Sequence, residues 1–238
     1  MGERSKTAVI TGGTGQLGSV VTLAMIKDGW HVVVPCRDMD AGSQLQSGLP
    51  KGMEQSCTLV EADLTVERDV ERLAERASCR SGRIDALVNL VGMFSFGTKI
   101  HELPAEKWHQ VMDVNLTGVF LACKHVLPAM LKSGRGCIVN TASKAAVDIQ
   151  PGAGVYAVAK AGVITLTQVL REELKDTSIT VNAIMPGIID TPVTRELMPK
   201  GDPSRWVKRE QIAETVVSLC NGRVAGVSGS VLCMFGRL

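Results

Sequence analysis

The feature that most constrains the fold is a glycine-rich turn between a predicted strand and a predicted helix near the start of the chain. Thr7 to Thr11 is a short apolar segment, and residues 19 to 27 carry apolar side chains at helical spacing. Between them, Gly13, Gly15 and Gly18 have the spacing of a dinucleotide-binding fingerprint. Backbone N–H groups and the helix dipole at such a turn can hold a pyrophosphate. The turn therefore predicts the first unit of a dinucleotide-binding α/β domain.

Predicted strands and helices alternate along the rest of the chain. The further strands are expected at residues 31–34, 56–61, 84–91, 137–141, 180–184 and 230–234, and the further helices at 65–80, 105–132, 153–173 and 209–220. Residues 191–208 are expected to form a loop or lid over the substrate. This alternation predicts a doubly wound parallel sheet of about seven strands, with helices on both faces, in a single domain over residues 1–238.

Composition excludes several classes of function. The chain has 238 residues, a net charge of +2 and only 3% aromatic residues, which argues against nucleic-acid binding. We find no apolar run of the roughly 18 residues that a membrane span needs. Seven scattered cysteines and the lack of a signal-peptide pattern favour a reducing, cytoplasmic location. The four histidines have no metal-ligand spacing, so no metal site is expected.

Tyr156 and Lys160 lie four residues apart in the predicted helix, on the same face. A phenol has a pKa near 10, and a lysine cation a few ångströms away can lower it by roughly one to three units. Such a phenol can give a proton to a developing alkoxide or take one from an alcohol. The pair alone is weak evidence, because both residue types are common on exposed helix surfaces.

The end of the second strand is where a domain of this type meets the adenosine ribose of its cofactor. An acidic residue there would bind the 2′-hydroxyl of NAD, whereas an arginine would accommodate the 2′-phosphate of NADP. The chain has Arg37 and then Asp38. Asp38 could pair with Arg37 or serve the ribose itself. Arg37 favours NADP(H) over NAD(H), and an NAD-dependent alcohol dehydrogenase is the alternative.

Motifs along essentially the whole chain resemble the short-chain dehydrogenase/reductase family. They are TGGTGQLG at residues 11–18, Asp63-Leu64, NLVG at 89–92, Asn115 in DVNLTG, Ser143 thirteen residues before Tyr156, Lys160, and Pro186-Gly187 with Thr191. Each motif is unspecific alone, but together and in order they identify the chain as a member. The resemblance implies a Rossmann-type fold and a nicotinamide cofactor at the carboxyl ends of the strands.

The resemblance also implies roles for particular residues. Tyr156 would be the acid/base, Lys160 would bind the nicotinamide ribose and lower the pKa of Tyr156, Ser143 would orient the substrate carbonyl, and Asn115 would hold a water for proton relay. The implied cofactor-binding set comprises Gly12, Thr14, Gly15, Gln16, Leu17, Gly18, Arg37, Asp63, Leu64, Asn89, Gly92, Tyr156, Lys160, Pro186, Gly187, Ile189 and Thr191. The implied assembly is a homo-oligomer, a dimer or tetramer formed through the two long helices.

The chain departs from the family pattern at Gln16, where glycine is usual, at Leu90-Val91, and at its last four residues. A non-catalytic cofactor-binding regulator is disfavoured, because the serine, tyrosine and lysine are all present. The expected substrate is a small carbonyl compound or alcohol, and the sequence does not identify it further. Cations in the lid and Lys144 would suit a carrier-bound acyl thioester, as in the similar 3-oxoacyl reductases, whereas a small neutral ketone would need none. The apolar lid residues expected to line the pocket are Val193, Leu197, Met198, Trp206 and Val207.

Overall fold

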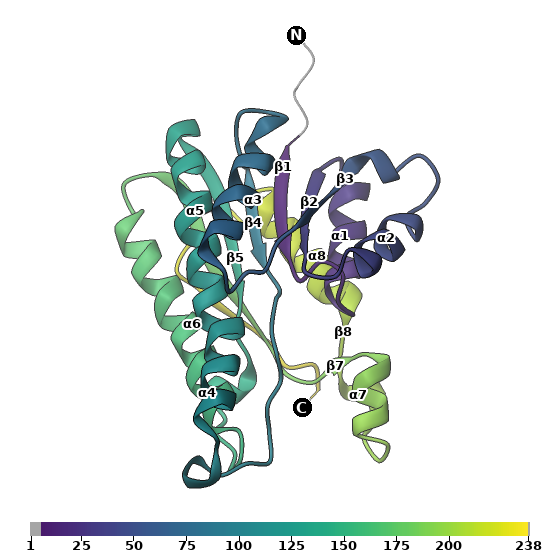
Figure 1. Cartoon of the computed structure of the whole chain (residues 1–238), viewed down its shortest axis with the longest axis vertical. Helices are drawn as coiled ribbons and strands as arrows, with labels where there is room; N and C mark the ends of the chain where they lie inside the picture. The colour runs from purple at the N-terminus through teal and green to yellow at the C-terminus, as the bar shows by residue number, and fades with distance from the viewer. Residues whose placement is uncertain (1–5, 238) are drawn as a thin grey trace.

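Seven parallel strands form the central sheet of the computed structural model, which describes residues 6–237 (Figure 1). Their order across the sheet is β3-β2-β1-β4-β5-β6-β9. The strands are β1 (Thr7–Thr11), β2 (His31–Cys36), β3 (Cys57–Glu61), β4 (Ala86–Asn89), β5 (Arg135–Thr141), β6 (Ser178–Pro186) and β9 (Val231–Met234). The predicted fold class and the number of strands in this sheet are confirmed.

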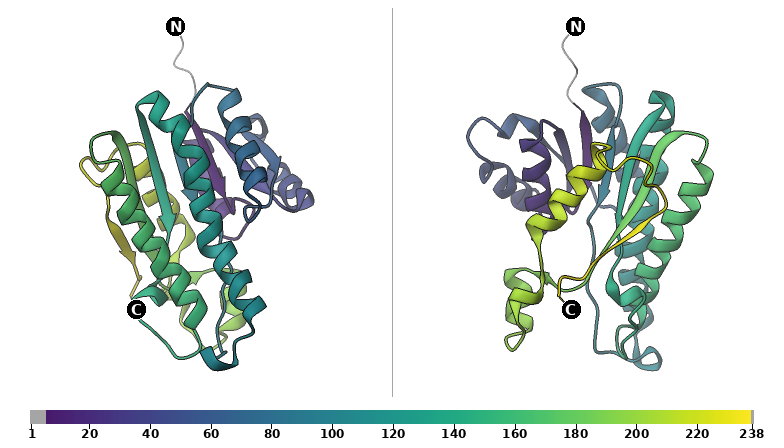
Figure 2. Two further views of the ribbon diagram at one scale, coloured as in Figure 1. Left: turned by 60° about the vertical axis from the view of Figure 1, so that its left-hand side comes forward. Right: turned by 180° about the vertical axis from the view of Figure 1, so that it is seen from behind.

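Helices cover both faces of the sheet (Figure 2). One face carries α1 (Gly18–Lys27), α2 (Met39–Ser47) and α8 (Arg209–Cys220), and the other carries α3 (Glu67–Cys79), α5 (Gly118–Ser133) and α6 (Gly154–Glu173). The helix α4 (Ala105–Met112) precedes α5 and packs beside α6.

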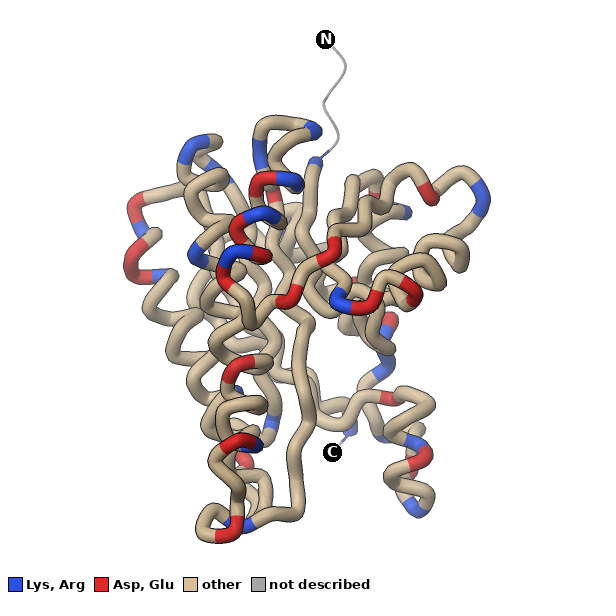
Figure 3. Tube along the Cα trace, viewed as in Figure 1, with Lys and Arg blue, Asp and Glu red and all other residues tan. Residues whose placement is uncertain are grey.

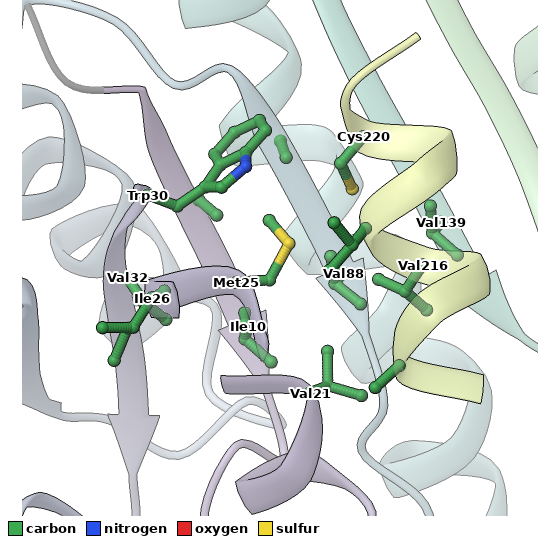
Figure 4. Close-up of a cluster of buried hydrophobic side chains, with 14 of the residues drawn as sticks. Ile10, Val21, Met25, Ile26, Trp30, Val32, Val88, Val139, Val216 and Cys220 are labelled. Atoms are coloured by element: carbon green, nitrogen blue, oxygen red, sulfur yellow. The ribbon is translucent and has the colours of Figure 1, made fainter. Parts of the chain in front are cut away.

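Alternate residues of each central strand face different cores, because side chains of a strand point to opposite faces. Ile10 and Val88 lie in the core under α1 and α8, whereas Val9 and Leu87 lie in the core under α3, α5 and α6. Figure 4 shows the first core, where Met25 and Trp30 pack against the strands beside α8. Burial on both faces explains why these strands are almost entirely apolar in sequence.

The predicted helix at 105–132 is two helices joined by a π turn at Asp113–Thr117. With that turn it runs from Ala105 to Ser133 and is long and apolar enough to cross a membrane by length and composition. Its apolar side chains, such as Val119 and Met130, pack into the core on the sheet. The hydropathy of this segment is therefore explained by its place in the fold.

Two segments differ from the sequence-based prediction. The helix α2 was not expected; it begins after Asp38, whose carboxylate accepts hydrogen bonds from the N–H groups of Asp40 and Ala41. The predicted lid loop contains a short helix, α7 (Pro192–Leu197), between two short paired strands, β7 (Ile189–Asp190) and β8 (Val207–Lys208).

The carboxyl ends of the strands form the lower edge of the sheet in Figure 1. The chain continues from β1 to β2 on one side and returns to β4 on the other side of β1. Such a reversal of strand order opens a crevice where α/β proteins bind their ligands. This edge is the place to look for the site.

Candidate active site

The glycine-rich turn after β1 has the shape of a phosphate cradle. Gly12 has a φ of 68°, and a Cβ there would lie 2.8 Å from the backbone nitrogen of Val91. A Cβ on Gly18 would lie 2.0 Å from the carbonyl oxygen of Gly12. Within residues 6–237, no side chain caps the start of α1, and its first turn holds no acidic residue. The turn can therefore place helix N–H groups against a pyrophosphate, and it fits a dinucleotide.

The other predicted cofactor residues lie along the same edge of the sheet. Thr14, Gly15, Gln16 and Leu17 belong to the turn itself, Asp63 and Leu64 follow β3, Pro186 ends β6 with Gly187 next, Ile189 lies in β7, and Thr191 caps α7. Thr191 accepts a hydrogen bond from the N–H of Thr194. Gln16, the unusual residue of the turn, is exposed, and its backbone carbonyl oxygen accepts a hydrogen bond from the guanidinium of Arg209. This arginine contact was not expected from the sequence.

Arg37 lies exposed at the end of β2, where it lines a cleft of about 620 Å³ with Asp63 and Arg76. Asp38 is occupied as the cap of α2. Hydrogen bonds from the N–H and hydroxyl of Thr65, together with the charge of Arg37, hold the pKa of the Asp63 carboxyl below its usual value. The guanidinium of Arg37 therefore faces solvent in a cleft that holds charges of both signs.

Asn89 is placed differently from the other cofactor candidates, since its side chain is buried within the sheet. Its amide group accepts a hydrogen bond from the hydroxyl of Thr11 and donates one to Asn140. Asn140 in turn donates to Thr167 on α6. This buried polar network joins β1, β4, β5 and α6, so the side chain of Asn89 is bonded within the sheet. This network was not predicted from the sequence.

Ser143, Tyr156 and Lys160 come together at the carboxyl end of β5. Ser143 follows the strand and caps the next short turn, where its hydroxyl accepts a hydrogen bond from the N–H of Ala145 at 3.3 Å. It also lies close enough to Tyr156 on α6 to lower the pKa of the phenol. Ser143 is therefore a cap of this turn, and its position beside Tyr156 is compatible with the predicted role of orienting a substrate carbonyl.

Lys160 lies beneath Tyr156 and is only 2% exposed. Its Nζ donates a hydrogen bond to the carbonyl oxygen of Thr141 at 2.9 Å and lies 5.9 Å from the centroid of the Tyr156 ring. Burial lowers the pKa of Lys160 to about 8. The lysine is thus a cation that gives up its proton much more readily than an exposed one.

The pKa of Tyr156 differs from the sequence-based prediction. Burial raises it, and the hydrogen bond from Ser143 opposes the rise only in part. The predicted net lowering by Lys160 is therefore wrong for this structure. The physical reason is that loss of solvent around the phenolate outweighs the favourable effect of the Ser143 hydroxyl.

Asn115 lies in the π turn between α4 and α5 and is completely buried. Its Nδ2 donates to the carbonyl oxygens of Met93 and Val111, both at 2.9 Å, and its Oδ1 accepts from the N–H of Met93. A Cβ on the neighbouring Gly92 would lie 3.1 Å from Asn115 Oδ1 and 3.4 Å from Lys160 Nζ. Asn115 therefore holds the loop after β4 close to Lys160.

We expect Asn115→Ala to damage both stability and turnover, because it leaves the buried carbonyl of Val111 and the part-buried carbonyl of Met93 without this partner and releases the loop that lies close to Lys160. The loss in unfolding free energy should be about 2 kcal/mol or more. Asn182→Ala is the matched control: Asn182 is also buried and bridges backbone groups, at Val227 and Ser230, near β9. Urea unfolding and kcat of the folded fraction should show similar destabilisation, with turnover lost only in Asn115→Ala. Equal turnover in the two variants would limit Asn115 to a structural role.

Two phenylalanines in the loop after β4 were missed by the sequence reasoning. Phe94 packs edge-on against the Tyr156 ring, and Phe96 stacks on Phe94. The only available signal was their position a few residues beyond a strand that ends at the site. In contrast, Trp206 and Val207 of the lid are buried, whereas Val193, Leu197 and Met198 are exposed.

Comparisons with known proteins agree with this geometry. A family model described as short chain dehydrogenase matches residues 6–202. The chain is 31% identical to the 3-oxoacyl-[acyl-carrier-protein] reductase FabG of Thermotoga maritima, over 98% of this chain and 97% of the relative. It is 31% identical to the cis-4-hydroxycyclohexanecarboxylate dehydrogenase of Sinomonas cyclohexanicum, over 99% and 98%. Among solved structures, ElxO with NADP bound superposes with a TM-score of 0.90 at 26% identity, over 98% of both chains.

Proposed function

Because the chain belongs to the short-chain dehydrogenase family and is an oxidoreductase, we propose that it reduces a carbonyl compound to a secondary alcohol with NADPH. The observation that carries this proposal is the meeting of Ser143, Tyr156 and Lys160 at the sheet edge that also holds the glycine-rich turn. The reaction is reversible, with Tyr156 giving the proton in one direction and taking it in the other.

The residues at the edge are suited to hold the cofactor along its length. The turn at Gly12 to Gly18 would take the pyrophosphate, Arg37 the ribose phosphate, and Lys160 the second ribose. When bound, the nicotinamide supplies or accepts the hydride. The protein residues position the carbonyl carbon and supply the proton to its oxygen.

Reduction is the direction that the environment of Tyr156 favours at neutral pH. Its raised pKa keeps the phenol protonated, so it is ready to donate to a carbonyl oxygen that gains negative charge. Ser143 and Tyr156 together offer two hydroxyl groups to that oxygen. Oxidation of an alcohol needs the phenolate, and the raised pKa therefore moves that direction toward alkaline pH.

A substrate panel tests the reaction class. Neutral ketones, aldehydes and acyl thioesters would be offered with NADPH, and its absorbance followed, and the panel repeated with NADH. We expect turnover of at least one carbonyl class, and a higher kcat/KM with NADPH. Turnover confined to NADH would replace the proposal by an NAD-dependent alcohol dehydrogenase, and no turnover of any carbonyl would remove it.

Arg37→Ala should raise KM for NADPH much more than for NADH. A charge-assisted contact to the 2′-phosphate contributes roughly 1.5–3 kcal/mol, which corresponds to about ten- to a hundredfold in affinity. The support is the exposed guanidinium at the end of β2, with Asp38 occupied at the start of α2. Arg223→Ala, an exposed arginine paired with Asp28, controls for the change in net charge. Equal effects on the two cofactors would contradict the role of Arg37.

A carrier-bound acyl thioester is a second candidate substrate, favoured by the similarity to the 3-oxoacyl-[acyl-carrier-protein] reductase. Two cations that would attract such a carrier are already paired, Arg195 with Asp190 and Lys144 with Asp148. We therefore rank the neutral ketone first. The carrier candidate requires that kcat/KM for an acetoacetyl thioester on its carrier falls steeply as salt rises, because screening weakens steering. A salt-independent rate would remove it.

We also propose that the protein acts in the cytoplasm as a homodimer or homotetramer. Free cysteines throughout the chain are compatible with a reducing compartment. Exposed apolar side chains on the two long helices, Phe120 on α5 and Val158 on α6, are candidates for the contact between subunits. Sedimentation of the purified protein tests the assembly, and a monomer at micromolar concentration would contradict it.

A further inference from the structure

We propose that Phe94 and Phe96 form a flat apolar platform beside the acid/base residue, and that it selects carbonyl compounds whose carbonyl carries a flat apolar ring. The substrate class would be aryl ketones and the matching aryl carbinols. The inference rests on the proposed function, because the ring would be placed by the platform while Ser143 and Tyr156 bind the oxygen.

The two rings of the platform are arranged so that a further flat ring can pack beside them. They lie nearly parallel, with an interplanar angle of 7° and centroids 6.2 Å apart. The Phe94 ring meets the Tyr156 ring edge-on, at 76° and 5.3 Å between centroids. Aromatic rings prefer these offset-stacked and edge-to-face contacts. A further ring placed against this surface would lie next to the phenol that donates the proton.

Both phenylalanines are exposed even though they belong to an anchored loop. Phe94 is 65% exposed and Phe96 is 58% exposed. On one side of them the backbone of Met93 is bonded to Asn115, and on the other the N–H of Gly97 donates to the carbonyl oxygen of Gly152 at 3.0 Å. The platform is therefore held at both ends. Two large apolar side chains kept in solvent by a fixed loop indicate a ligand-binding surface.

The loop that carries the platform is apolar, although the ammonium of Lys107 lies at its start, 3.8 Å from the sulfur of Met93. The segment at residues 90–98 carries no charged residue, as the tan trace below β4 in Figure 3 shows. The segment after Ser143, which leads to the Gly97 contact, exposes Val147 by 58% and Ile149 by 64%. Lys144, the cation next to Ser143, is paired with Asp148. A neutral apolar substituent on the carbonyl is therefore better matched to this site than a charged one.

The test compares acetophenone with cyclohexyl methyl ketone, which share a carbon skeleton and differ in the flatness of the ring. The ratio of their kcat/KM values with NADPH would be measured for the wild type, Phe94→Leu and Phe96→Leu. Leucine keeps an apolar side chain but removes the flat face. The intrinsic reactivities of the two ketones cancel when the ratio of their kcat/KM values is compared between variants. We expect each substitution to lower the preference for acetophenone by about three- to tenfold, the size of an aromatic contact.

A binding measurement separates this inference from the proposed reaction. Affinities of the two ketones for NADPH-loaded Tyr156→Phe, which retains the aromatic ring at residue 156, would be obtained by ligand-observed NMR with and without Phe94→Leu. If Phe94→Leu removes the preference for acetophenone in binding, the platform is supported. This holds even if no ketone is turned over, and in that case only the proposed function fails. An unchanged ratio in both measurements, with turnover intact, overturns the platform and leaves the proposed function standing.

Discussion

Tyr156→Phe is expected to lower kcat for carbonyl reduction by about a hundredfold or more, because general acid catalysis of this kind contributes 10²–10⁴-fold. The substitution removes the hydroxyl and keeps the ring, so the edge-on contact with Phe94 remains. The cofactor cradle around Gly12 is distant in sequence and made by backbone groups, and NADPH affinity should stay close to that of the wild type. Single-turnover kinetics and NADPH fluorescence titration measure the two quantities separately.

Ser143→Ala is the companion variant. It removes the hydroxyl that lowers the pKa of the phenol and leaves the phenol in place. We expect a smaller loss of kcat than in Tyr156→Phe. The pH dependence of kcat should also shift toward alkaline pH, because the variant lacks the Ser143 hydroxyl that opposes the rise in the pKa of Tyr156. If Tyr156→Phe kept more than about a tenth of the wild-type kcat, the phenol would not be the acid in the rate-limiting step.

The elements that the sequence predicted well are those with a strong local signal. The strand and helix around the glycine-rich turn follow from the apolar run at Thr7–Thr11 and the helical period after Gly18. The central strands are buried on both faces, and their continuous apolar sequence shows it. The order of the strands in the sheet was not predicted in detail, because pairing between distant segments depends on packing that no short pattern reveals.

The features that the sequence did not reveal are mostly the contacts that particular side chains make. Asn89 has a place in the family motif near the cofactor, but its side chain joins a buried network because Thr11 and Asn140 flank it across the sheet. The sequence left two roles open for Asp38, pairing with Arg37 or binding the ribose. An aspartate just before a helical segment is a capping signal, and it could have predicted α2. The direction in which the pKa of Tyr156 is shifted depends on burial, which is a property of the folded site.

Lys160 illustrates a conflict between stability and function that only the structure reveals. The unfolded chain holds the lysine proton with a pKa near 10.4, and burial lowers that pKa to about 8 in the folded protein. Between these two pH values the unfolded chain binds more protons than the folded one, so unfolding free energy should increase as pH rises through this window. Below pH 8 both states are protonated, and the full cost of burying the cation, about 3 kcal/mol for a difference of this size, is present.

Lys160→Met should therefore stabilise the protein at pH 7 while it abolishes activity. Methionine takes the buried position of Lys160 without a charge, and after the loss of the hydrogen bond to the Thr141 carbonyl the gain is about 2 kcal/mol, or roughly 4–8 °C in Tm. The increase of stability with pH between about 8 and 10 should disappear in the variant, and both kcat and NADPH affinity should fall with the loss of the cation. Thermal unfolding at pH 7 and at pH 10, alongside NADPH titration, measures each effect. A variant that is less stable than the wild type at pH 7 would mean that Lys160 contributes to folding through its contacts more than its burial costs.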